Sequence, residues 1–302
     1  MRPASHPTKQ QRLSITSTSP TIYMTTELHA TVELGGTPDP LTDRVRATWT
    51  AGDFGRIAKG YSLGAAEFIA RLELEPDERV LDVACGTGNL ALPAARIGAS
   101  VAGIDIVPNL IAQARARAAA ERLAIIFEVG DAERLPYANG TFDSVVTMFG
   151  AMFAARPERA ATELVRVTRK GGRIAMANWT PTGFIGEMLK TTVNYVPPPA
   201  GIPSPLLWGT EDAVRARLGS ASASLTFSRR LITFEYPFAP EQVVSEFRLW
   251  YGPTLRAFGA LAEDARHDLR RDLETLWTEH NRASDGTTRV QSEYLEVIAV
   301  VK

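Results

Sequence analysis

The chain has 302 residues, of which 45% are hydrophobic and 22% are charged, and its formal net charge is −1. A chain of this length and composition buries a substantial core, which excludes a mainly disordered or fibrous protein. The near-neutral charge supplies no global field for nucleic acid or an anionic membrane surface, so we expect neither as a partner.

The single cysteine, Cys85, excludes an intramolecular disulfide and a cysteine-based metal cage. We therefore expect no metal, and a cytoplasmic location because a lone thiol suits a reducing compartment. The sequence contains no run of about 18 apolar residues, so we expect no membrane span.

Residues 1–40 differ in composition from the rest of the chain. Residues 1–23 are rich in Ser and Thr, contain no acidic residue and lack the apolar segment of a secretory signal. We expect a disordered tail, with Met24 as an alternative start of the chain. An acid-poor transit peptide is the other interpretation.

From residue 41 to residue 75 the apolar spacing predicts two helices, with a break at Gly52 and Asp53. Strand-like and helical segments then alternate. We expect strands at 79–84, 100–106, 124–129, 143–149 and 172–179, and helices at 89–97, 108–122 and 157–168. Strict alternation indicates parallel strands joined by right-handed crossovers, and hence an open α/β sheet.

The C-terminal part follows another pattern. Two strand-like segments, 225–235 and 294–301, are widely separated along the chain. A stretch rich in Pro and Gly (180–218) and a helical stretch (240–282) are expected as insertions late in the sheet.

Aromatic residues recur at helical spacing in the second insertion, where they form either core or a lid over a ligand: Phe247, Trp250, Tyr251 and Phe258.

A glycine motif follows the first expected strand. Gly86 and Gly88 belong to a G-x-G-x-x-A run at the start of a helix, where glycines let the backbone turn tightly and approach a ligand. Asp105 ends the second strand, and a carboxylate there accepts hydrogen bonds from both ribose hydroxyls of a nucleoside. The pattern predicts a nucleoside-containing cofactor across the ends of these strands.

Two further acids narrow the choice of cofactor. Asp82, just before the glycines, would repel a pyrophosphate but suits the ammonium of an amino acid, directly or through water. Asp131 follows the third strand and can accept a hydrogen bond from an adenine amino group. A cationic ligand with ribose and adenine fits these acids, and S-adenosylmethionine has those parts.

The sequence resembles the class I S-adenosylmethionine-dependent methyltransferases, especially the methyltransferase type 11 branch that includes the ubiquinone/menaquinone methyltransferases. The motifs of that branch stand at residues 82–89 (DVACGTGN), 130–136 (GDAERLP), 142–146 (FDSVV) and 170–172 (KGG), with the acidic strand end at Asp105.

The resemblance implies a Rossmann-like, seven-stranded, mostly parallel sheet with a reversed C-terminal strand, helices on both faces and helical insertions forming a lid. It implies one methyltransferase domain at 41–302, with an N-terminal helical cap (41–75), a cofactor-binding core (76–179) and acceptor-side insertions (180–218 and 240–282).

The implied cofactor is S-adenosylmethionine and the implied product is S-adenosylhomocysteine. Gly86 and Gly88 would line the methionine and ribose portion, Ile106 and Ala132 would flank the adenine, and Met148 would border the methyl group. The full set of expected cofactor-binding residues is Asp82, Ala84, Gly86, Gly88, Asn89, Asp105, Ile106, Asp131, Ala132 and Met148.

The expected reaction is in-line transfer of the methyl group to an O, N or C atom of a small-molecule acceptor, catalysed mainly by proximity and orientation. No residue is identified as a general base. His267, His280 or a tyrosine of the lid would serve, or no base is needed. The sequence leaves the acceptor and the oligomeric state open.

There are three alternatives to this interpretation. An NAD(P)-dependent oxidoreductase is disfavoured by Asp82 and Asp131 and by the absence of a Tyr-x-x-x-Lys pair. A non-catalytic protein that binds S-adenosylmethionine would not need the large insertions. Nucleic-acid modification is disfavoured by the near-neutral charge.

Overall fold

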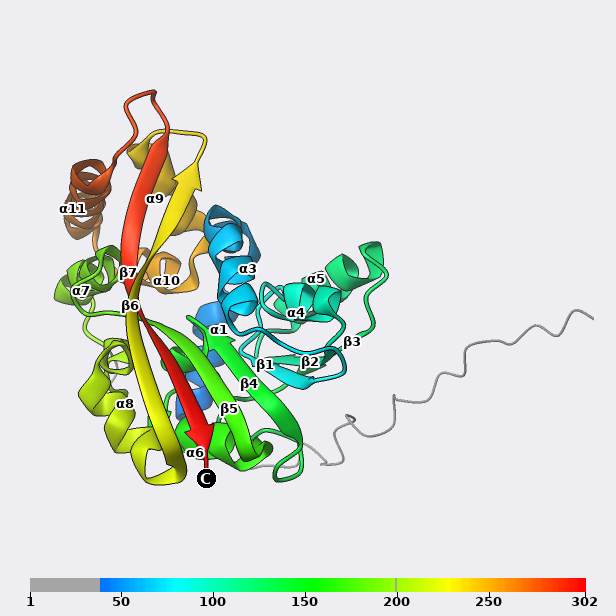
Figure 1. Cartoon of the computed structure of the whole chain (residues 1–302). Coiled ribbons are helices and arrows are strands. Elements are labelled where there is room, and N and C mark those ends of the chain that lie inside the picture. Colours follow the sequence, from blue (N-terminus) through cyan, green and yellow to red (C-terminus); the bar gives the residue numbers. More distant parts are fainter. Residues whose placement is uncertain (1–38, 199) are drawn as a thin grey trace, which may run out of the picture.

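The structure, a computed structural model, describes residues 39–198 and 200–302. The expected N-terminal tail and Met24 lie outside these residues, apart from Asp39 and Pro40 at the end of the tail. A seven-stranded sheet forms the centre of the molecule, with the strand order β3-β2-β1-β4-β5-β7-β6 (Figure 1). The strands are β1 (Arg79–Val83), β2 (Ser100–Asp105), β3 (Ile125–Val129), β4 (Phe142–Met148), β5 (Thr168–Trp179), β6 (Ser222–Tyr236) and β7 (Thr288–Val301).

Strands β1 to β5 pair in parallel, and β7 runs antiparallel to both β5 and β6. This arrangement confirms the expected mostly parallel sheet with a reversed C-terminal strand. β1 lies between β2 and β4 and is buried along four of its five residues, as expected for a parallel strand covered on both faces.

Helices cover the sheet and its carboxyl end. They are α1 (Pro40–Thr50), α2 (Phe54–Ala58), α3 (Ser62–Arg71), α4 (Ala91–Ile97), α5 (Pro108–Ala120), α6 (Pro157–Val167), α7 (Phe184–Tyr195), α8 (Glu211–Leu218), α9 (Pro240–Trp250), α10 (Gly252–Ala260) and α11 (Glu263–His280). A proline occupies the first turn of α1, α5, α6 and α9, where its missing N–H leaves no helical hydrogen bond unmade.

The N-terminal helical cap contains the expected break and a second one. The chain leaves α1 at Ala51, and the side chain of Asp53 caps α2 by accepting a hydrogen bond from the amide of Gly55. The second break, a 3-10 turn at Lys59–Tyr61, separates α2 from α3. The cap is therefore three short helices rather than the expected two.

The long hairpin of β6 and β7 extends beyond the carboxyl end of β5 and carries the second insertion (Figure 1). β5 pairs with β7 only as far as Tyr294, whereas β6 stays paired with β7 up to Thr288. Helices α7, α9, α10 and α11 pack together at this extension. The insertions therefore lie where the parallel strands end.

Trp277 of α11 holds these helices to the hairpin. Its indole is 1% exposed and packs edge-on against Phe184 of α7, Phe234 of β6 and Phe247 of α9, with centroid distances of 4.5, 6.3 and 5.3 Å. One side chain thus links three elements that are far apart in the sequence.

Because truncating Trp277 leaves a large cavity among these rings, we expect Trp277→Ala to lower the free energy of unfolding by about 3–5 kcal/mol. Leu249→Ala on α9 is the matched control, since Leu249 is 56% exposed. It should change the free energy of unfolding by less than about 0.5 kcal/mol. Urea denaturation of both variants measures the difference, and similar losses in the two would contradict this packing scheme.

Candidate functional site

Three adjoining cavities lie at the carboxyl ends of the parallel strands, next to the point where the strand order reverses between β1 and its two neighbours. The first, the strand-end cavity, has an empty volume of about 680 Å³, which includes space that is open to solvent. The residues that follow β2, β3 and β4 line one side of it, and α1 and α2 cover the other side through Val45, Trp49 and Phe54.

The second cavity, the loop cavity, surrounds the glycine loop after β1, and its empty volume of about 360 Å³ includes space that is open to solvent. Asp82, Gly86 and Asn89 line it, together with Phe54 and Tyr61 of the cap. Nine of the ten residues expected to bind the cofactor line one of these two cavities. The tenth, Gly88, lines neither of them.

The two glycines of the motif have different structural roles. Gly86 has φ +54°, and a Cβ at this position would meet nothing within 4 Å, so a ligand can approach its backbone closely. Gly88 has φ +80°, and its Cβ would lie 2.5 Å from Leu92 Cδ1. Glycine is favoured at position 88 by this left-handed conformation, and the turn packs closely against Leu92 of α4.

The chain also adopts left-handed conformations at two non-glycine residues that line the strand-end cavity. Ala84 follows β1 with φ +56°, and Phe149 follows β4 with φ +57°. Gly150 fits beside Ala84, because a Cβ on Gly150 would lie 2.6 Å from the Ala84 Cβ. Strained backbone of this kind concentrates at functional sites.

Asp105 ties the ends of β1 and β2 together. Its Oδ2 accepts a hydrogen bond from the Gly86 amide at 2.8 Å, and its Oδ1 accepts one from the Val107 amide at 2.9 Å. Burial raises the pKa of Asp105 to about 6, although these amides and that of Ile106 act in the opposite direction. Each carboxylate oxygen retains a lone pair that can accept a further hydrogen bond in the cavity.

Asp82 lies below the glycine loop and is 1% exposed. Its Oδ2 accepts a hydrogen bond from the Ala91 amide at 3.0 Å, which caps the start of α4. Burial raises the pKa of Asp82 well above its usual range, and the nearby Asp105 raises it further. Asp82 therefore has a helix-capping role in addition to lining the loop cavity.

The remaining expected residues lie at the ends of β2, β3 and β4. Ile106, Asp131, Ala132 and Met148 all line the strand-end cavity. The Asp131 carboxylate accepts a hydrogen bond from the Glu133 amide at 2.9 Å, which fixes the turn after β3. The structure thus brings residues from three separate strand ends to one cavity.

Arg117 of α5 was not anticipated from the sequence. Its Nη1 donates to the Thr87 carbonyl at 2.7 Å, to Thr87 Oγ1 at 3.0 Å and to Asn89 Oδ1 at 2.7 Å. Four residues earlier on the same helix, Gln113 Nε2 donates to Asp53 Oδ1 at 3.0 Å. The spacing of four was the available signal, because it places both polar side chains on one helical face.

Two polar contacts hold the N-terminal cap over the strand-end cavity. One is the Gln113–Asp53 hydrogen bond to α2. In the other, Arg156 donates to Asp39 Oδ1 at 2.6 Å and to Glu133 at 3.1 Å, joining the start of α1 to the chain after β3. Arg156 lowers the pKa of Asp39 to about 2. These contacts keep Trp49 and Phe54 in the cavity wall.

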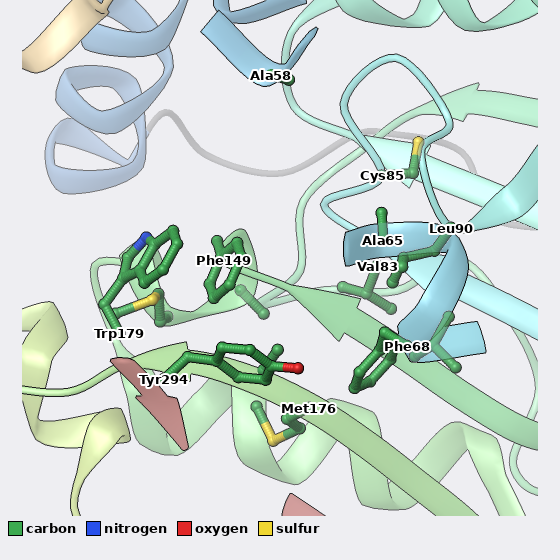
Figure 2. Close-up of a cluster of buried hydrophobic side chains, with 14 of the residues drawn as sticks. Ala58, Ala65, Phe68, Val83, Cys85, Leu90, Phe149, Met176, Trp179 and Tyr294 are labelled. Atoms are coloured by element: carbon green, nitrogen blue, oxygen red, sulfur yellow. The ribbon is translucent and has the colours of Figure 1, made fainter. Parts of the chain in front are cut away.

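The third cavity, the aromatic chamber, lies between the cap, the end of the sheet and the insertion helices, and its empty volume of about 320 Å³ includes space that is open to solvent. Nine of its twelve lining side chains are aromatic, and the others are Ile57, Ile185 and Met188. Phe149 and Trp179 form part of its wall as parallel stacked rings with centroids 3.4 Å apart, and Figure 2 shows them face to face.

The chamber shares Trp49, Phe54, Phe149 and Phe153 with the strand-end cavity. Phe54 also lines the loop cavity, so its ring stands where all three cavities meet. Of the four aromatic residues expected as core or lid, Phe247 and Tyr251 line the chamber, whereas Trp250 and Phe258 line none of the three cavities.

The two histidines considered as general bases line none of the three cavities. His280 Nδ1 lies 3.0 Å from the Leu276 carbonyl, and His280 Nε2 lies 3.3 Å from Glu187. Cys85 lines the loop cavity, but burial raises the pKa of its thiol well above the usual range. The thiol is therefore protonated and unsuited to act as a nucleophile.

If Arg117 holds the glycine loop in place, Arg117→Met should increase hydrogen–deuterium exchange at the amides of residues 86–89 in the ligand-free protein. Arg115→Met is the matched control, because Arg115 lies on the same helix but donates to the Phe127 carbonyl. Equal exchange in the loop of the wild type and the Arg117 variant would show that other contacts hold it.

The chain matches the family model described as "Methyltransferase domain" over residues 81–176. Two proteins of Mycobacterium tuberculosis, both described as uncharacterized, are 36% and 37% identical to it. These alignments cover 83% and 84% of this chain and 91% and 93% of the relatives. A demethylmenaquinone methyltransferase of Deinococcus radiodurans is 38% identical over 127 residues, which cover 41% of this chain and 53% of that enzyme.

The fold is shared with solved structures. The crystal structure of the YcgJ protein from Bacillus subtilis superposes with a TM-score of 0.54 and 17% sequence identity, covering 80% of this chain and 98% of that one. The match to the methyltransferase family argues against the alternative interpretation as an NAD(P)-dependent oxidoreductase.

The chain belongs to the class I S-adenosylmethionine-dependent methyltransferases, in the methyltransferase type 11 branch that includes the ubiquinone/menaquinone methyltransferases.

Proposed function

We propose that this protein transfers the methyl group of S-adenosylmethionine to a small molecule bound in the aromatic chamber. The observation that carries the proposal is the position of Phe54, which lines the strand-end cavity, the loop cavity and the chamber. A cofactor spanning the first two cavities would meet the third at that point. A protein that only senses the cofactor has no need of such a chamber.

The residues at the strand ends fit this cofactor. Asp105 would accept hydrogen bonds from the ribose, since each of its buried oxygens accepts one backbone amide and retains a lone pair for a further hydrogen bond. Ile106 and Ala132 would flank the adenine, and Asp131 would accept from its amino group. The open space above Gly86 admits the methionine portion, with Asp82 and Asn89 in the same cavity.

When bound, S-adenosylmethionine supplies a methyl group on a sulfonium, and the electron pair of the broken carbon–sulfur bond remains on the sulfur. The protein's task is to place the nucleophilic atom of the acceptor in line with that bond and to exclude water. An electron pair of the acceptor forms the new bond to carbon, and any proton that the acceptor atom carried is released when the methylated product reaches solvent.

The lining of the chamber supports a mechanism in which the protein positions the acceptor, and in which no side chain removes a proton as a general base. Among the described residues that line it, none is Asp, Glu, His, Lys or Arg. Burial raises the pKa of Tyr61 and Tyr251 above the usual range for tyrosine, so both phenols stay protonated at neutral pH. They can donate hydrogen bonds but do not serve as general bases.

Isothermal titration calorimetry with S-adenosylhomocysteine tests the cofactor assignment. We expect binding in the micromolar range by the wild type, weakened about tenfold or more in Asp105→Asn because hydrogen bonds to a charged acceptor are lost. Asp268→Asn on the exposed face of α11 is the control and should bind as the wild type does. If the folded wild-type protein does not bind S-adenosylhomocysteine, the proposal is wrong.

The same carboxylate predicts a pH dependence. The pKa of Asp105 is raised to about 6 in the free protein, and ribose hydroxyls donate to the ionised form. Affinity for 5′-methylthioadenosine, which lacks the amino-acid group near Asp82, should therefore rise about tenfold from pH 5 to pH 7 and then level off. Asp105→Asn should abolish this rise; a flat wild-type profile would contradict the assigned role.

A further inference from the structure

A further cavity, the α6–α8 cavity, lies apart from the three cavities at the strand ends. Helices α6 and α8 contact each other, and the cavity between them has an empty volume of about 650 Å³, which includes space that is open to solvent. Its lining residues are Glu158, Thr162, Ala213, Ala216 and Arg217. None of them lines the strand-end cavity, the loop cavity or the aromatic chamber. The proposed methyl transfer therefore gives this cavity no role.

Arg217 of α8 places a buried cation in the wall of the α6–α8 cavity. Its side chain is 7% exposed, and its Cζ lies 4.6 Å from the centroid of the Trp208 ring. Trp208 belongs to a 3-10 turn at Pro205–Gly209 and is 1% exposed. Because the indole covers one face of the guanidinium, partners for the cation must approach its N–H groups in the guanidinium plane.

The charge of Arg217 is only weakly compensated. Within residues 39–198 and 200–302, the one carboxylate at ion-pair distance is that of Glu158, whose Oε1 lies 3.4 Å from Arg217 Nε. The Glu158 side chain is 73% exposed, so water screens its charge. Arg217 Nη1 and Trp208 Nε1 are both buried and have no hydrogen-bond partner in the part of the chain that the structure describes. Buried donors are normally satisfied and buried charges are normally paired.

We propose that the α6–α8 cavity binds a small oxyanion, either a phosphate or a carboxylate group, through the guanidinium of Arg217. The planar guanidinium matches the geometry of an oxyanion, and charge-assisted hydrogen bonds are roughly twice as strong as neutral ones. Ala213 and Ala216 have side chains of a single carbon, which leaves room for a ligand in the cavity. This site is separate from the cofactor site and does not depend on the proposed methyl transfer.

Glu158 would compete with such a ligand, because its carboxylate lies beside the Nε of Arg217. Its exposed side chain can turn into solvent when an anion pairs with the guanidinium. Removal of its charge should therefore strengthen anion binding, since like charges repel each other. If the Arg217–Glu158 pair served only to stabilise the fold, removal of Glu158 would produce no gain in anion binding.

Titration of the full chain with sodium phosphate and, separately, with sodium acetate tests the site, with sodium chloride added to keep the ionic strength constant. The readout is the indole N–H resonance of Trp208 in proton–nitrogen correlation spectra, which is assigned from its loss in Trp208→Phe. We expect a saturable shift of this resonance, because the indole stacks on the guanidinium. Tighter binding of phosphate would indicate a phosphate-bearing ligand, and tighter binding of acetate would indicate a carboxylate.

Arg217→Met should weaken binding of the tighter anion at least about tenfold, because charge-assisted hydrogen bonds are lost. Replacing a buried charge by an apolar side chain of similar length is often tolerated by the fold. Arg215→Met is the matched control, because it removes the same charge from the same helix, at a side chain that is 54% exposed and pairs with Glu211. It should change the affinity by less than about twofold.

Glu158→Gln should tighten anion binding about twofold to fivefold, the effect of one exposed charge, whereas Glu211→Gln on α8 should have a smaller effect. Three results would overturn the proposal: a Trp208 resonance that responds to neither anion, equal affinities in the wild type and Arg217→Met, and weaker binding by Glu158→Gln. If Arg217→Met does not fold, Arg217→Lys replaces it, because lysine keeps the charge but loses the planar fork. Unchanged affinity in that variant would equally overturn the proposal.

Discussion

The hydrogen bond from the Gly86 amide to the Asp105 carboxylate is the contact on which the site depends. It joins the ends of the two neighbouring strands β1 and β2, and it holds a carboxylate in a buried place where the charged form is disfavoured. Arg117 also holds the glycine loop, because it donates hydrogen bonds to the Thr87 carbonyl and to Asn89 Oδ1. The loop is therefore pre-organised before any ligand arrives, which reduces the ordering cost of binding.

The cap and the insertion helices cover this strand-end site. Asp53 and Arg156 anchor the cap to the chain around the sheet, and Trp277 anchors the insertion helices to the hairpin of β6 and β7. Phe54 stands where the two parts meet. In the proposed function, water exclusion and acceptor placement would come from elements outside the parallel core, whereas the core would provide the cofactor site.

The parallel core of the fold could be predicted from the sequence, because its strands and the turns that follow them are encoded by neighbouring residues. Asp105 ends a strand of clear hydrophobic pattern and Gly86 follows another, and the Gly-Asp pair at residues 52 and 53 predicted the break in the cap. β7 begins at Thr288 rather than near Tyr294, since its first residues alternate with polar side chains that weaken the pattern. The sequence did not predict the roles of Arg117 and of the chamber residue Trp179, because these roles depend on contacts between segments that are distant in the chain.

A crystal structure of the protein with S-adenosylhomocysteine would show directly whether the cofactor binds at the strand ends. We expect density that runs from the loop cavity beside Asp82 to the strand-end cavity, with the ribose on Asp105 and the adenine between Ile106 and Ala132. The sulfur should face the chamber next to Phe54. Density for the ligand outside these two cavities, or a sulfur turned away from the chamber, would show that the proposed cofactor site is wrong.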